Sequence, residues 1–94
     1  MNWEIILTSK VQRQRKELPK KVRFRFDLLI KEMSIAGPYR KNWGHYSKLK
    51  TQANCFHCHI KDGHPTYVAC WEVIEKTIKL VEVYYVGTHE SAPY

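Results

Sequence analysis

The first 19 residues predict a strand followed by a short helix. Residues 3–8, WEIILT, are mostly aliphatic, aromatic or β-branched, which favours a buried first strand. Ser9 and Gln12, three residues apart, have the spacing of a capping box. In this motif the serine hydroxyl and the glutamine side-chain amide form hydrogen bonds with free backbone amides of the first helical turn. Pro19 ends this helix near Leu18 and can open the next, because proline lacks an N–H but fits a first turn.

Residues 20–36 predict a second helix with one buried stripe. Its apolar residues recur at positions i, i+4, i+7, i+8 and i+11: Val22, Phe26, Leu29, Ile30 and Met33. The Gly-Pro pair at residues 37–38 interrupts the helical pattern, and residues 37–47 predict a loop with aromatic residues at intervals.

The remainder of the chain predicts strands at residues 47–50, 55–60, 66–75 and 77–87, with turns at Asp62-Gly63 and Glu75-Lys76. We therefore expect a single domain over residues 1–94 with an α+β fold. In it, two amino-terminal helices pack on a twisted, mostly antiparallel sheet of four to five strands, in the order β-α-α-β-β-β-β.

Positive charge is concentrated in the amino-terminal half of the chain. Residues 1–50 hold 13 basic and 4 acidic side chains, a net charge of +9, whereas residues 51–94 hold 3 and 5, a net charge of −2. A polyanion is the natural partner for such a half, since phosphate contacts release counterions and steer association. The same side chains also suit a solvated helix face, and charge alone does not name the target.

The amino-terminal segment and the cysteine count indicate a cytoplasmic protein. MNWEIIL carries an acidic residue where a signal peptide needs basic ones, and its apolar run stops at Thr8, short of the ~18 residues of a membrane span. We expect no contact with a membrane. Three cysteines, an odd number, predict free thiols.

Residues 55–59, CFHCH, spell the pattern of covalent haem attachment. In a strand, however, Cys55, His57 and His59 share one face while Cys58 lies on the other with Phe56 and Ile60. The two cysteines then point in opposite directions, and we expect no haem.

A zinc site is also a candidate for this segment, because His64 could fold back toward the face of Cys55. A structural zinc site needs a second ligand pair at recognisable spacing, and Cys70 alone does not supply one. We therefore expect no zinc, and we expect Cys58 and Cys70 to be small core residues.

The carboxy-terminal segment, residues 66–94, resembles the end of toxins of the RelE/ParE superfamily from bacterial type II toxin–antitoxin systems. In that family, a strand-turn-strand unit closes on a V-G-T-H-like ending with an aromatic residue soon after. Here residues 86–89 are Val-Gly-Thr-His, and Tyr94 is the terminal aromatic residue. The order of elements fits the family over essentially the whole chain. The resemblance implies a cognate antitoxin as partner.

The resemblance implies either of two activities. Many members are ribosome-dependent mRNA endonucleases, whereas others poison DNA gyrase and lack catalytic groups. RNA cleavage without a metal needs a base for the 2′-hydroxyl proton, an acid for the leaving 5′-oxygen, and cations for the charge on phosphorus. Histidine suits both proton transfers, because its ordinary pKa of about 6.5 populates both forms near neutral pH.

Histidines at family positions favour the nuclease. His59 and His89 match sites where histidine-using members place catalytic groups, and Tyr94 could stack on a base or position the phosphate. His57 shares a face with His59, so it is either the alternative candidate for the catalytic imidazole or an RNA contact. We expect a metal-independent endoribonuclease without cofactor that cuts mRNA on the ribosome, with its basic half on ribosomal RNA.

Phosphate contacts are expected from Lys48 and Lys50, which would share a strand face, and from Lys61 after the histidine strand. RelE-type members rely on arginine in the middle strands, but residues 55–86 contain none, which favours the histidine version. His45 and His64 are expected in loops, and Trp71 in the core. A gyrase inhibitor, another binding module of this fold, and a zinc-dependent regulator stay open as alternatives.

Overall fold

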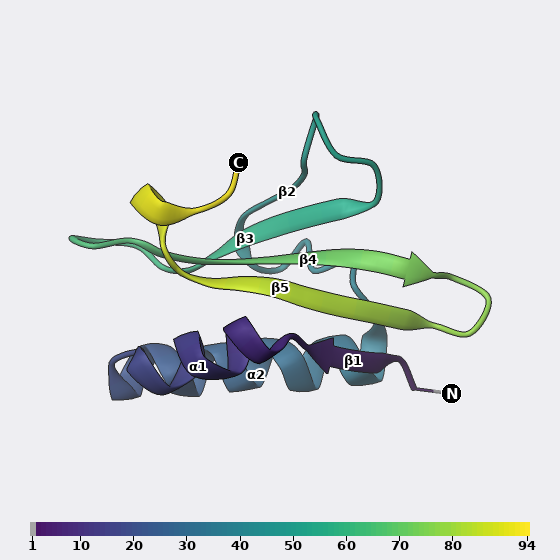
Figure 1. Cartoon of the computed structure of the whole chain (residues 1–94), viewed down its shortest axis with the longest axis horizontal. Coiled ribbons are helices and arrows are strands. Elements are labelled where there is room, and N and C mark those ends of the chain that lie inside the picture. Colours follow the sequence, from purple (N-terminus) through teal and green to yellow (C-terminus); the bar gives the residue numbers. More distant parts are fainter. Residues whose placement is uncertain (1) are drawn as a thin grey trace.

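The computed structural model describes residues 2–94 and places two helices against one face of a five-stranded sheet (Figure 1). The elements are β1 (Glu4–Leu7), α1 (Ser9–Glu17), α2 (Lys20–Ala36), β2 (Gly44–Lys48), β3 (Cys55–Lys61), β4 (Tyr67–Glu75), β5 (Leu80–Thr88) and the 3-10 helix η1 (His89–Ser91). The strands lie in the order β1-β5-β4-β3-β2, antiparallel except for the parallel pair β1 and β5. The predicted α+β class and element order are confirmed.

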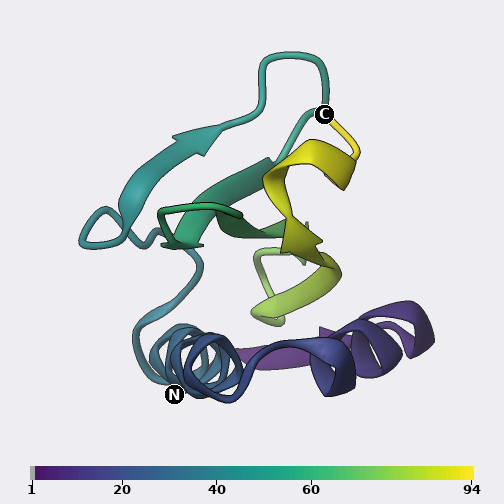
Figure 2. The same cartoon turned by 90° about the vertical axis from the view of Figure 1, so that its left-hand side faces the viewer.

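The helices and the carboxy-terminal segment lie on opposite sides of the sheet. In both views α1 and α2 form a layer under the sheet, while η1 and the chain end curl over the other face (Figures 1 and 2). One sheet face is therefore covered by helices, and the other, which we call the open face, is covered only in part.

The start of α1 differs from the predicted capping box. Thr8 is the N-cap, and its hydroxyl accepts a hydrogen bond from the Val11 amide at 3.1 Å. The side-chain amide of Gln12 donates to the Leu7 carbonyl at 3.1 Å. The capping box at Ser9 is wrong, because Ser9 is already the first residue within the helix and Thr8 supplies the cap.

The second helix follows its sequence pattern closely. Val22, Phe26, Leu29 and Met33 are buried, and Ile30 is half-buried against the same core. Helix α2 ends at Gly37, which has a φ of 98° and donates its amide to the Met33 carbonyl. Among residues 2–94, no helix combines the length and the apolar character needed to cross a membrane.

Three strand predictions need correction. The last strand begins at Leu80 and not at residue 77, because residues 77–79 belong to the turn before β5. Strand β1 is not buried, because it lies at the sheet edge with only β5 beside it, and its residues alternate between exposed and half-buried. Strand β2 spans residues 44–48 rather than 47–50, since Gly44 pairs with His59 and draws the preceding residues into the sheet. Lys50 therefore lies beyond β2, and His45 lies within it.

Candidate active site on the open face

Alternation along β3 separates the core from the candidate site. Phe56, Cys58 and Ile60 are buried in the core between the sheet and the helices, as predicted. His57 and His59 lie on the open face and are half-buried. The same strand thus supplies core contacts on one side and two imidazoles on the other.

The open face brings the predicted catalytic rings together. The ring centroids of His59 and His89 are 5.6 Å apart, and those of His89 and Tyr94 are 6.0 Å apart. His57 lies 4.7 Å from Tyr94 and 6.1 Å from His59 between ring centroids. We call these four residues the histidine cluster. Its rings share one side of the sheet, away from the helices.

The ending Val-Gly-Thr-His has a packing reason for its glycine. A Cβ on Gly87 would lie 2.7 Å from the Tyr85 hydroxyl, which is closer than atoms in contact can be. This hydroxyl donates to the Thr88 carbonyl at 2.7 Å, and the His89 amide donates to the Thr66 carbonyl at 2.8 Å. Together these contacts fix the point where β5 ends and His89 turns toward His59.

A pocket of about 300 Å³ lies between the two catalytic candidates. His59 and His89 line it together with Thr66 and Thr88. The side chain of His59 is 15% exposed, so it contacts the pocket while most of its ring packs against protein. The pocket can therefore admit a polar group to both imidazoles.

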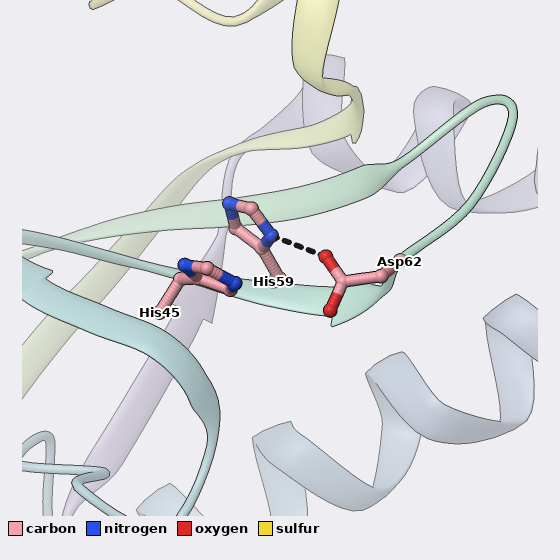
Figure 3. A group of neighbouring side chains, drawn as sticks. All are labelled: His45, His59 and Asp62. Atoms are coloured by element: carbon pink, nitrogen blue, oxygen red, sulfur yellow. Dashed lines mark hydrogen bonds and ion pairs between the residues drawn. The ribbon is translucent and has the colours of Figure 1, made fainter.

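Asp62 orients His59, a pairing that the sequence analysis did not predict. Its Oδ1 lies 2.6 Å from Nδ1 of His59 (Figure 3). The hydrogen bond from His59 lowers the pKa of this carboxyl below its ordinary value, so Asp62 is ionised at neutral pH. An ionised carboxylate only accepts hydrogen bonds, so Nδ1 of His59 carries a proton. In the neutral form of the ring, Nε2 then holds the free lone pair.

His45 contacts His59 from the neighbouring strand. Its ring stacks on that of His59 with centroids 4.1 Å apart and an interplanar angle of 26°. The backbone of His45 has a φ of 53°, at an irregularity in the pairing between Gly44 and Ser47. The expectation of a loop position for His45 is wrong, whereas His64 does lie in the loop between β3 and β4.

Burial changes the acidity of two cluster members. Desolvation by burial lowers the pKa of His57, whose Nδ1 lies 3.2 Å from the Ser47 hydroxyl. Burial raises the pKa of Tyr94 to about 12, so its phenol stays protonated and can donate a hydrogen bond. His57 is thus neutral and Tyr94 is a donor at neutral pH.

The basic residues divide into two groups. Lys61 lines a groove of about 380 Å³ that also contacts His59, and the helix α2 adds Lys21 and Arg25 to this groove. The Arg25 Nε donates to the Ile60 carbonyl at 2.5 Å, which holds a guanidinium near β3. The helix α2 therefore brings a guanidinium close to β3, a long-range approach that no local pattern signals.

The other two predicted phosphate contacts lie elsewhere. Lys48 pairs with Phe56, which faces the helices, while its neighbour Ser47 faces His57. Lys50 follows the end of β2. The expectation that Lys48 and Lys50 share a strand face is therefore wrong, because β2 ends at Lys48.

The three cysteines are free, and Cys58, Cys70 and Trp71 have no exposed surface. The core positions predicted for these residues are confirmed. Burial raises the pKa of both Cys58 and Cys70 to about 12, so these thiols stay protonated at neutral pH. They are therefore poor nucleophiles and poor metal ligands.

No protein-family model matches the sequence, and no curated protein is similar to it at a significant level. Solved structures do match. RelE of the archaeal RelE–RelB complex from Pyrococcus horikoshii has a TM-score of 0.76 at 16% identity, over 98% of this chain and 100% of that one. The isolated E. coli RelE toxin has a TM-score of 0.72 at 19% identity, over 97% of this chain and 88% of that one. The chain has the RelE fold.

A more distant RelE-fold neighbour is the toxin–antitoxin complex RelBE from Mycobacterium tuberculosis, with a TM-score of 0.59 at 16% identity, over 95% of this chain and 100% of that one. Several of these neighbours were solved together with an antitoxin. At such identities, the likeness to RelE concerns the arrangement of the backbone. The chemistry depends on the side chains of this chain, which the fold alone does not determine.

Proposed function

We propose that this chain is the toxin of a type II toxin–antitoxin system and a metal-independent endoribonuclease that cuts mRNA on the ribosome. The observation that carries the proposal is the convergence of His59 and His89, from β3 and the end of β5, with ring centroids 5.6 Å apart beside an open pocket. The RelE fold supports the choice of toxin class. We assign RNA as the substrate because two converging imidazoles can act as the base and the acid for attack by a 2′-hydroxyl, a group that DNA lacks.

In the proposed reaction, His59 is the general base. Its Nε2 accepts the proton of the 2′-hydroxyl while Asp62 holds the ring through Nδ1. The 2′-oxygen attacks phosphorus, and the bond from phosphorus to the 5′-oxygen breaks. His89, in its protonated form, donates a proton to that oxygen as it leaves. The products are a 2′,3′-cyclic phosphate and a 5′-hydroxyl, and the protons balance between the two imidazoles.

Other groups position the phosphate and stabilise its charge. Tyr94 donates a hydrogen bond or stacks on a base beside His57, whose neutral ring limits repulsion between neighbouring imidazolium groups. Lys61 and Arg25 supply positive charge from the groove next to His59. Lys48 pairs with Phe56, toward the opposite end of β3 from this groove, and Lys50 follows the end of β2. We assign both lysines to flanking mRNA or ribosomal RNA.

A protein antitoxin is the proposed partner of this chain. RelE has been solved with RelB in several of the similar structures. By analogy, an antitoxin would neutralise this chain by covering its basic surface or the open face. The proposed site of action is the cytoplasm, where ribosomes and message meet.

A translating extract tests the proposed function. The chain should cut message, and His59→Ala and His89→Ala should each reduce the cleavage rate by about 10²–10⁴-fold, the usual contribution of a general acid or base. Asp27→Asn is the control, because Asp27 is an exposed residue that pairs with Arg15 between the helices, on the other side of the sheet from the pocket. Undiminished cleavage in both active-site variants would rule out the assigned roles. Intact message together with failed DNA supercoiling would instead identify a gyrase inhibitor.

A further inference from the structure

Three side chains beside the proposed base have the donor set of a transition-metal site. A ring nitrogen of His45, a ring nitrogen of His59 and a carboxylate oxygen of Asp62 all lie within 4.8 Å of one another. Figure 3 shows the two imidazoles side by side, with Asp62 reaching back toward them from the end of β3. Two imidazoles and one carboxylate are ligands that zinc accepts in proteins.

The backbone holds this group together before any ion arrives. His45 lies in an irregular stretch of β2 with a left-handed φ of 53°, and this stretch brings its ring onto that of His59 at 4.1 Å. A non-glycine residue in this conformation is unusual, and such residues concentrate at functional sites. His45 has no part in the proposed cleavage reaction, so the reaction does not explain its placement.

The ligand types select the kind of ion. Imidazole favours zinc and its transition-metal neighbours, whereas magnesium prefers oxygen ligands and retains its water. Zinc binds nitrogen and oxygen donors at about 2.0–2.2 Å, so two donors of one tetrahedral ion lie roughly 3.3 Å apart. The His59 and Asp62 donors, now 2.6 Å apart, must therefore separate slightly, and the side chains must adjust around the ion. His45 and Asp62 are exposed and can make this movement, while His59 is held by its surroundings.

We propose that His45, His59 and Asp62 bind one zinc ion, and that this ion inhibits the nuclease. A neutral imidazole has one lone pair and one N–H. When zinc takes the lone pair at Nδ1 of His59, the remaining proton sits on Nε2. The ring then has no atom that can accept the 2′-hydroxyl proton. Zinc is thus an inhibitor here and not a cofactor of cleavage.

Metal binding can be measured without any RNA. Purified chain is first stripped with a chelator and then titrated with Zn²⁺ by calorimetry and with Co²⁺ by visible absorption. We expect one equivalent of each ion, and d–d bands for Co²⁺. Loss of a residue that only hydrogen-bonds to a metal ligand already lowers metal affinity by about 10–100-fold. Loss of a ligand itself, in His45→Ala or Asp62→Asn, should therefore weaken Zn²⁺ binding by more than about tenfold. Asp27→Asn, which changes an exposed carboxylate between the helices, should bind like the wild type.

The inhibition rests on the proposed function and needs a second measurement. The cleavage rate in a translating extract is compared with and without added Zn²⁺, at constant Mg²⁺. The ratio of the two rates should fall in the wild type and in Asp27→Asn, and stay near one in His45→Ala. Using a ratio removes any effect of His45→Ala on the metal-free rate.

The outcomes separate the two proposals. Absence of bound Zn²⁺ and Co²⁺, or binding that survives both His45→Ala and Asp62→Asn, overturns the zinc site even if the chain cuts RNA. Zinc bound as described with no change in the wild-type rate ratio overturns the inhibition. A metal-free chain that cuts no RNA overturns the nuclease, while the titration alone still decides the zinc site.

Discussion

The covered face and the open face of the sheet use the same strands for different purposes. On the covered face, between the sheet and the helices, Trp71 has no exposed surface, and Phe56 stacks on it with ring centroids 6.4 Å apart. On the open face, His57 and His59 stay partly exposed and are surrounded by other rings and by polar partners. Because strand side chains alternate, one residue step separates a group that stabilises the fold from a group that can carry out chemistry. Substitutions on the two faces should therefore affect different quantities.

The largest expected effect is a loss of stability when a side chain of the covered face is truncated. Trp71→Ala should lower the free energy of unfolding by about 3–5 kcal/mol, because it leaves a large cavity and removes the hydrogen bond from the indole to the Pro38 carbonyl. Denaturant unfolding followed by circular dichroism measures this loss. His59→Ala on the open face is the comparison, and its loss should stay below about 1 kcal/mol. Equal losses would show that the two faces do not divide stability from chemistry.

The next effect is on the rate of cleavage. Asp62→Asn should slow cleavage with little loss of stability, because Asp62 is exposed and acts on the reaction only by orienting His59. Its effect should be smaller than the roughly 10²–10⁴-fold cost of removing a general base. Single-turnover cleavage gives the rate, and ¹⁵N NMR of the imidazoles should show His59 losing its preference for the Nδ1–H form.

Asp27→Asn is the matched control for the carboxylate. Asp27 is an exposed aspartate that pairs with Arg15 between the helices, far from the histidine cluster in the fold. Its variant should cleave at the wild-type rate. If both aspartate variants slow cleavage equally, or if neither does, Asp62 has no specific role.

A pair of glycines tests how the end of β5 is held. Gly87→Ala should destabilise the chain by about 1–3 kcal/mol, since the new methyl group meets the Tyr85 hydroxyl at 2.7 Å. It should also slow cleavage, because the displaced segment carries His89. Gly44→Ala is the control for stability, because the nearest atom to its added methyl group is 4.0 Å away. Thermal unfolding of the two variants is compared, together with the cleavage rate of Gly87→Ala, and equal losses of stability would contradict the close packing at Gly87.

The smallest expected signal comes from the buried thiols. With pKa values of about 12 against an ordinary 9.0, Cys58 and Cys70 should stay protonated and unreactive toward a disulfide reagent at pH 9. Since the unfolded thiols ionise at lower pH than the folded ones, stability should fall as pH rises above 9 toward 12. Reagent absorbance before and after denaturation measures the thiols, and rapid reaction of Cys58 or Cys70 in the native state would contradict their burial.

Most of the fold follows from local patterns in the sequence. The stripe from Val22 to Met33 predicts α2, and the alternation in residues 55–60 predicts which side chains of β3 face the helices. Both patterns report burial against a neighbouring layer, which is the strongest signal that a single sequence carries. The N-cap was misplaced by one residue because Thr8 and Ser9 both suit that position.

The candidate site was harder to predict, because its contacts depend on pairing between distant segments. The resemblance pointed to His59, His89 and Tyr94, but no pattern in the sequence showed that His45 stacks on His59. That contact depends on the register of β2 against β3 and on the irregularity within it. A weaker signal existed for Asp62, which lies three residues after His59 at the end of a strand.

The most direct test of the nuclease is the chemistry of the cut ends. Ribosome-bound message is cleaved by the purified chain, and mass spectrometry identifies the terminal groups of the fragments. Attack by the 2′-hydroxyl between His59 and His89 should give a 2′,3′-cyclic phosphate and a 5′-hydroxyl, and a single 2′-deoxynucleotide at the cut site should abolish cleavage. A 3′-hydroxyl with a 5′-phosphate, or unchanged cleavage of the deoxy-substituted message, would contradict this mechanism.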